Sequence, residues 1–193
     1  MKRQVFRSTP SFVFAWLWMA FAAANLVDLA VRGRDVTSVI AAGSLLLGAG
    51  VAYVIGLRPR VVADDAGLWL HNPLRDVRLP WSAVDKVETT DAIEVRSGDR
   101  TFRAYALQVS PRARARAKSR PRRDAMLPDH VAEHVKGRLP IDFAVEQLND
   151  LATRNRGEEP AAPPSVSLSW FAIATLAVPA AVLAAAIPMA ILG

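Results

Sequence analysis

The chain has 193 residues, 52% of them hydrophobic, and carries 24 lysine and arginine residues against 18 aspartate and glutamate residues, a net charge of +6. It contains no cysteine, which excludes disulfide bonds, thiolate catalysis and cysteine-ligated zinc. The hydrophobic residues gather in blocks on both sides of a charged middle. This composition predicts membrane segments that flank one small water-soluble domain.

The chain begins with a basic segment and a first apolar stretch. Residues 1–10 are expected to be a cytoplasmic N-terminus, and residues 11–31 are long enough to cross a hydrocarbon core of about 30 Å as a helix. Asp28 lies one turn before Arg32, so we expect an ion pair at the membrane edge; a buried functional carboxylate is the alternative. An Ala-x-Ala pattern inside this stretch would also fit a cleaved signal peptide.

Residues 36–57 form a second predicted span. Ser44, Gly48 and Ala52 recur every four residues and make one face of small side chains, along which another helix can approach closely. Because only a few residues join the two stretches, the first span is expected to pack on this face. Packing of a second copy of the chain there remains open.

Residues 58–156 are expected to form the water-soluble domain. Between Arg58 and Leu107, polar and apolar residues alternate in short runs separated by turn signals, among them the "DDAG" that ends at Gly67 and the "SGD" at residues 97–99. Five or six short strands in this space predict an antiparallel sheet or an open barrel.

The stretch "VVADDAGLWLHNPLRDVRLPWSAVDKVE" resembles the pleckstrin-homology-like (PH-like) domains of actinobacterial membrane proteins. Matching places are occupied by Gly67, Arg78, Pro80, Trp81 and Val84. The resemblance implies a curled antiparallel sheet of seven strands, capped by a C-terminal helix, which serves as a non-catalytic binding scaffold. Two carboxylates at the first hairpin, Asp64 and Asp65, argue against a phosphoinositide site there, because they would repel a polyphosphate.

An arginine-rich loop is expected at residues 111–124. Like charges at this density favour an unfolded loop, and anionic lipids of the inner leaflet would attract it. A solvated loop without a ligand is the alternative; nucleic-acid binding is disfavoured because no aromatic residues interleave with the charges. Seven basic residues make up the candidate contact: Arg112, Arg114, Arg116, Lys118, Arg120, Arg122 and Arg123.

A histidine pair follows the arginine-rich loop in "HVAEH". On a helix, His130 and His134 would share one face, with Glu133 beside them, so a membrane metalloenzyme is an alternative function. We expect instead an exposed amphipathic helix without metal, since a hydrolytic zinc site needs a third protein ligand and the chain leaves no room for a protease domain. No cofactor is predicted.

An amphipathic helix is predicted to close the domain between Pro140 and Gly157. Residues 157–164 are a proline-rich linker, and residues 168–192 are the third predicted span, with Trp170 suited to the headgroup layer. Pro179 and Pro188 are tolerable there and are expected to bend the helix. The apolar stripe of the amphipathic helix consists of Ile141, Val145, Leu148, Leu151 and Ala152.

The sequence therefore predicts three transmembrane helices and a small α+β domain. Basic residues flank the membrane on one side at Lys2, Arg3 and Arg7 and again at Arg58 and Arg60, which places the N-terminus and the domain in the cytoplasm and the C-terminus outside a bacterial inner membrane. The predicted function is non-enzymatic: a scaffold for a protein partner with an arginine-rich lipid contact. A structural subunit that assembles through small-residue helix faces is the third alternative.

Overall fold

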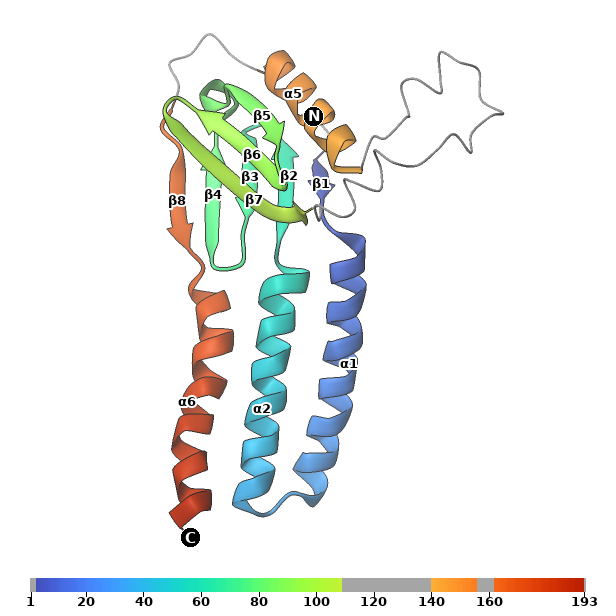
Figure 1. Ribbon diagram of the computed structural model, residues 1–193, viewed down its shortest axis with the longest axis vertical. Coiled ribbons are helices and arrows are strands. Elements are labelled where there is room, and N and C mark those ends of the chain that lie inside the picture. The colour runs from blue at the N-terminus through green and yellow to red at the C-terminus, as the bar shows by residue number, and fades with distance from the viewer. Residues whose placement is uncertain (1–2, 109–139, 156–161, 193) are drawn as a thin grey trace, which may run out of the picture. The chain divides into compact units, whose positions relative to one another are not determined.

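The computed structural model describes residues 3–108, 140–155 and 162–192 (Figure 1). Its internal contacts divide the chain into two compact units. The helical unit consists of Arg7–Pro59, Asn72–Asp76 and Val166–Gly193, and the β-unit consists of Met1–Phe6, Arg60–His71 and Val77–Ser165.

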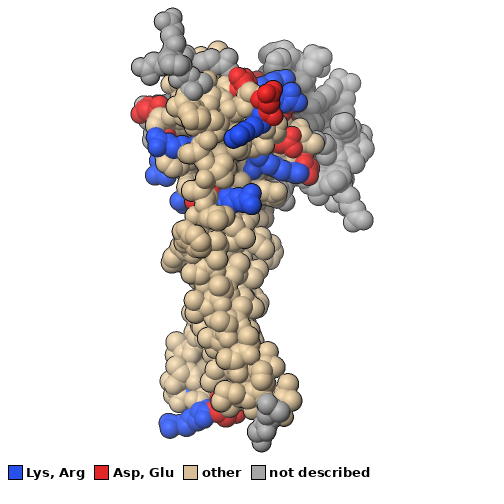
Figure 2. Space-filling model, turned by 90° about the vertical axis from the view of Figure 1, so that its left-hand side faces the viewer, with Lys and Arg blue, Asp and Glu red and all other residues tan. Residues whose placement is uncertain are grey.

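The helical unit contains α1 (Thr9–Arg32), α2 (Val36–Ala52), the π-helical turn η1 (Tyr53–Leu57) that continues α2, and α6 (Trp170–Leu192). Among the described residues, three helices are long and apolar enough to cross a membrane: α1, α2 with η1, and α6. On the face of this unit that Figure 2 shows, most of the length carries no charged side chains. The three predicted spans are thus present as helices.

Glycines set how closely the helices of this unit pack. A Cβ atom built on Gly43 would lie 3.0 Å from Leu183 of α6, and one on Gly50 would lie 2.3 Å from the Thr175 carbonyl oxygen of the same helix. On the other side of α2, a Cβ on Gly48 would meet the Trp18 ring of α1 at 2.7 Å. Helix α2 therefore lies between α1 and α6 (Figure 1), with Gly43 and Gly50 toward α6 and Gly48 toward α1.

The connection between α1 and α2 is ordered by two carboxylates. Asp28 lies 3.0 Å from Arg32 Nε, which confirms the expected ion pair. Asp35 caps α2, because its carboxylate accepts hydrogen bonds from the Ser38 hydroxyl and, at 3.0 Å, from the Ser38 N–H. These bonds, the hydroxyl bond first, lower the pKa of Asp35.

The strands form two antiparallel layers around one core. One sheet has the order β1-β2-β3-β4-β8 and the other the order β5-β6-β7. Residues of β2, β3, β4, β5, β6 and β7 fill the core between them together with residues of α5. The strands are β1 (Gln4–Phe6), β2 (Arg60–Asp64), β3 (Gly67–His71), β4 (Arg75–Leu79), β5 (Lys86–Thr89), β6 (Ala92–Ser97), β7 (Arg100–Gln108) and β8 (Ser165–Leu168).

Helix α5 (Pro140–Asn155) closes the core of the β-unit with the predicted apolar stripe. Ile141, Leu148 and Ala152 are buried, Val145 packs against the core, and Phe143, off the stripe, is 48% exposed. Asn149 joins the helix to the sheet: its Nδ2 donates to the Val87 carbonyl at 2.7 Å, and its Oδ1 accepts from the Val87 N–H at 2.9 Å. One side chain thereby satisfies both backbone groups of an edge-strand residue.

The turn between β2 and β3 depends on Gly67. Its φ is +145°, and a Cβ there would lie 2.3 Å from the Leu79 carbonyl oxygen, so a larger residue is excluded by both conformation and space. Close by, Trp81 in the short helix η2 (Trp81–Ala83) is buried, and its Nε1 donates to the Asp64 carbonyl at 2.8 Å. Gly67 and Trp81, two of the residues that carried the PH-like resemblance, thus both contribute to the packing at this turn.

The predicted fold class is confirmed: apolar helices, a curled antiparallel sheet and a capping helix occur in the predicted order. Two strands were not predicted. Strand β1 lies in the expected N-terminal tail and pairs with β2, and β8 follows the predicted linker and forms an edge of the larger sheet. The short helix expected around "PDHVAEHVKGR" lies outside the described residues.

Candidate functional site

The residues predicted to contact lipid lie outside the part of the chain that the structure describes, as do His130, Glu133 and His134. Within the described residues, no group of three or more histidine, aspartate or glutamate side chains could hold a metal ion.

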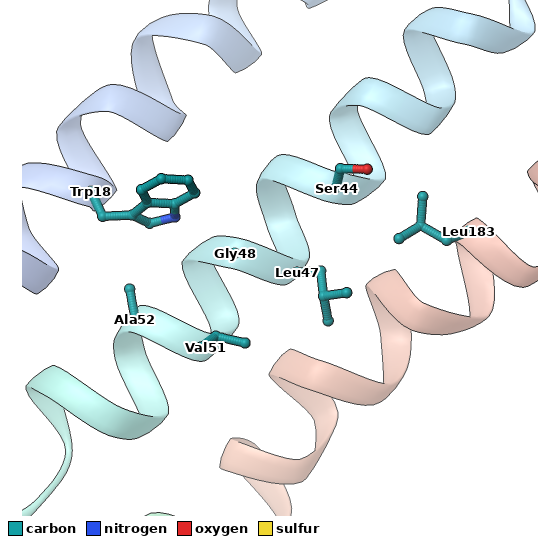
Figure 3. A pocket seen from close by; sticks show the side chains of 7 residues that line it. All are labelled: Trp18, Ser44, Leu47, Gly48, Val51, Ala52 and Leu183. Carbon is teal, nitrogen blue, oxygen red and sulfur yellow. The ribbon is translucent and has the colours of Figure 1, made fainter.

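The small-residue face of α2 lines a groove of the helical unit. Ser44, Gly48 and Ala52 form its floor, and the groove has a volume of about 500 Å³ (Figure 3). Figure 3 shows Trp18 of α1 on one side of Gly48 and Leu183 of α6 on the other. The remaining lining residues, Leu47 and Val51, also come from α2, and the lining is almost entirely apolar.

The Trp18 ring occupies the space that the missing side chain of Gly48 leaves. Ser44, by contrast, is exposed, and its hydroxyl donates to the Ile40 carbonyl at 2.8 Å. The first span therefore does contact the predicted face at Gly48, while Ser44 stays open to the groove.

A Trp–Arg cluster lies on the larger sheet of the β-unit. The Arg78 guanidinium carbon is 4.6 Å from the centroid of the Trp69 ring, and the His71 ring lies roughly parallel to Trp69 at 6.4 Å. Arg78 is exposed, whereas Trp69 and His71 are half-buried. A guanidinium that stacks on an indole presents its positive charge beside an apolar ring. Arginine and tryptophan side chains are both common at the centres of protein interfaces.

The tip of the first hairpin is closed to phosphate. Asp64 Oδ1 accepts hydrogen bonds from the N–H groups of Ala66 at 3.0 Å and Gly67 at 3.1 Å. These are the backbone donors that an anion at this turn would need, and a carboxylate already uses them. The geometry agrees with the sequence argument against a phosphoinositide site at this hairpin.

The smaller sheet carries paired charges. Glu88 lies 2.8 Å from Lys86 Nζ and 3.3 Å from Arg96 Nε, and Arg103 pairs with Asp91. The hydrogen bond from Lys86, followed by the charge of Arg96, lowers the pKa of Glu88. These basic side chains are committed to carboxylates within the unit, so this sheet offers no concentrated basic patch among the described residues.

The segment Asn72–Asp76, which consists of the turn between β3 and β4 and the first two residues of β4, belongs by its contacts to the helical unit. Asp76 Oδ2 lies 2.7 Å from Nη2 of Arg58, the residue that follows η1, and the Leu74 carbonyl accepts from the Ser169 N–H at 2.9 Å, just before α6. The Arg58 side chain is 8% exposed, and its Nη1 has no hydrogen-bond partner. Sequence reasoning missed this arrangement, because nothing local in "NPLRD" signals that its partners lie at two helix ends.

Comparison with known proteins gives one match. Residues 58–133 match the family described as the bacterial PH domain, a range that covers strands β2 to β7 and also includes the arginine-rich segment. No curated protein and no solved structure matches the chain significantly. The curled sheet and the capping helix α5 agree with this match, so residues 58–133 are similar to the bacterial PH domain family.

Proposed function

We propose that the protein is a multi-pass bacterial inner-membrane protein that displays its PH-like domain in the cytoplasm as a non-catalytic scaffold for a protein partner. The observation that carries the proposal is the bacterial PH match at residues 58–133 between helices of membrane-spanning length. Such tethering raises the effective concentration of the domain at the bilayer, so weak contacts suffice there.

Charge supports the cytoplasmic orientation. Arg32, at the end of α1, and Arg34, in the connection between α1 and α2, are the two basic residues on one side of the two helices. The short flanks on the other side carry more basic residues, Lys2, Arg3, Arg7, Arg58 and Arg60, and the side with more basic residues is proposed to be the cytoplasm.

The arginine-rich segment is the proposed lipid contact. Its basic residues face a single acidic one, Asp124, in the sequence, and each Lys or Arg near an anionic surface contributes roughly 1 kcal/mol. Ordering part of a loop costs about 1–2 kcal/mol for each residue that becomes fixed. The binding free energy of several such contacts therefore exceeds this cost only if few residues become fixed. We therefore propose a loose, non-specific association that depends on anionic lipid.

The lipid contact is tested with a fluorophore in the segment. Because the chain lacks cysteine, Ser119→Cys provides a single labelling site in the full-length protein. In vesicles that contain phosphatidylglycerol, the label should shift to the blue at low salt and return at high salt. Neutral residues at the seven basic positions should abolish the shift, whereas arginine-to-lysine replacement should preserve it; equal spectra in phosphatidylcholine vesicles would contradict the proposal.

The Trp–Arg cluster supports the proposed protein contact. Exposed Arg78 over Trp69 has the composition of interface hot spots. Site-specific photo-crosslinkers at Arg78 and, as a control on the smaller sheet, at Arg100 should give a partner adduct at Arg78 alone. Equal adducts at both sites, or none at Arg78, would remove this surface from the proposal.

Assembly through the groove of α2 is a second candidate, favoured by its open, small-residue floor. A helix from a second copy would then reach Ser44, which is exposed, more readily than Gly48, which faces Trp18. Disulfide crosslinking of Ser44→Cys in membranes should give a dimer if this candidate is right. Val178→Cys on α6 serves as the comparison. If Ser44→Cys gives only monomer, this candidate is rejected.

A further inference from the structure

Two hydrogen-bonded contacts join the segment Asn72–Asp76, the turn before β4 and the start of β4, to the ends of two membrane helices. Arg58, bonded to Asp76, directly follows the second span, and Ser169, bonded to Leu74, directly precedes the third. Both contacts lie inside the helical unit. The turn therefore lies at the depth where these helices leave the hydrocarbon.

Exposed apolar side chains gather at this depth. Leu74 at the turn is 40% exposed, Leu168 at the end of β8 is 49% exposed, and Trp170 at the start of α6 is 75% exposed. We call these three residues the boundary rim. Apolar groups that remain exposed next to a membrane span mark a surface that lipid or another protein covers.

The dimensions of a bilayer favour lipid as the occupant. The polar layer on each side of the hydrocarbon core is roughly 5–8 Å thick. Leu168 is two residues before Trp170, which places it within about 7 Å along an extended chain. Leu74 lies in the same layer because its carbonyl is bonded to residue 169.

We propose that the boundary rim inserts between the headgroups and the acyl chains of the surrounding phospholipids. Leu74 and Leu168 supply apolar contact with the upper acyl chains, and the indole of Trp170 suits the transition between the two layers. This contact rests on apolar burial, so it forms with neutral and anionic phospholipids alike and uses no residue of the arginine-rich segment. It makes the turn between β3 and β4 a membrane-contacting element of the PH-like domain.

Depth-dependent quenching tests the rim in the full-length protein. Leu74→Cys and Leu168→Cys would carry a fluorophore in phosphatidylcholine vesicles containing lipids with a nitroxide high or low on the acyl chain. Val178→Cys, an exposed position within α6, is the membrane control, and Ser97→Cys, at the end of β6, is the water control. The labels at Leu74→Cys and Leu168→Cys should be quenched more by the high nitroxide than by the low one. The label at Val178→Cys should be quenched more by the low nitroxide, and the label at Ser97→Cys should be quenched by neither.

Rim labels that behave like the Ser97→Cys label would overturn the proposal, and so would quenching that requires anionic lipid. A charged variant gives a second measurement: Leu74→Asp should reduce quenching of a label at Leu168→Cys several-fold, while Leu74→Met should leave it unchanged. Equal quenching in both variants would also overturn the proposal. Because the vesicles are neutral, failure of the arginine-rich lipid contact would leave these results unaffected.

Discussion

Gly50 marks the closest approach between the backbones of α2 and α6. A side chain there would begin 2.3 Å from the Thr175 carbonyl oxygen, which is backbone and cannot rotate away. We expect Gly50→Val to separate the two helices and to cost about 1–3 kcal/mol, as overpacked cores do. Thermal unfolding in detergent should show a lower midpoint. Ser44→Val places the same side chain at an exposed position of α2 and should leave the midpoint nearly unchanged; an equal loss in both variants would contradict the explanation.

Glu88 makes the stability of the smaller sheet sensitive to acid. Its pKa is lowered by the hydrogen bond from Lys86 and then by Arg96, so folding favours the ionised form. This contribution is fully present above the ordinary glutamate pKa of about 4.3 and is lost as the pH falls through the lowered value. NMR titration of the Glu88 carboxyl should give a midpoint below that of an exposed glutamate. Lys86→Gln should raise the midpoint more than Arg96→Gln; the opposite order would contradict the assigned cause.

Helix α5 is attached to the sheet by one amide as well as by its apolar stripe. Asn149→Leu would leave the Val87 N–H and carbonyl without their partners, at a cost of about 1–3 kcal/mol. Hydrogen exchange in β5 should accelerate roughly 5- to 150-fold while β3 is affected less. Thr153→Ala removes only a bond to the Asn149 carbonyl within the helix and serves as the control. Unchanged exchange in β5 would mean that apolar packing alone holds the helix.

At the scale of elements, long periodic patterns were predictable and short strands were not. The stripe from Ile141 to Ala152 identified α5, because an amphipathic helix repeats its signal over several turns. Strands β1 and β8 have three and four residues and adjoin apolar spans, so their alternation is too short to separate from its surroundings. These segments form strands because they pair with neighbouring strands, and not because of a pattern in their own residues.

At the scale of the whole molecule, the proposed orientation makes a directional prediction. Ser97→Cys should react with a membrane-impermeant thiol reagent only after the cells are permeabilised, because the β-unit is proposed to be cytoplasmic. Arg34→Cys, in the connection between α1 and α2, should react in intact cells. The reversed pattern would place the PH-like domain outside and would remove the inner-leaflet role of the arginine-rich segment.

The sequence by itself determined the three spans, the PH-like β-strands and the closing helix, because hydrophobic length and periodicity are local properties. It also identified the small-residue face of α2 and the packing of the first span on it, which occurs at Gly48, although not that Gly43 and Gly50 face α6. Only the tertiary structure decided which side chains meet at the helix ends, since Arg58 and Asp76, or Leu74 and Ser169, are brought together by folding across many residues. Local patterns of hydrophobic residues indicate which face of each segment is buried, whereas contacts between distant segments depend on how the whole chain packs.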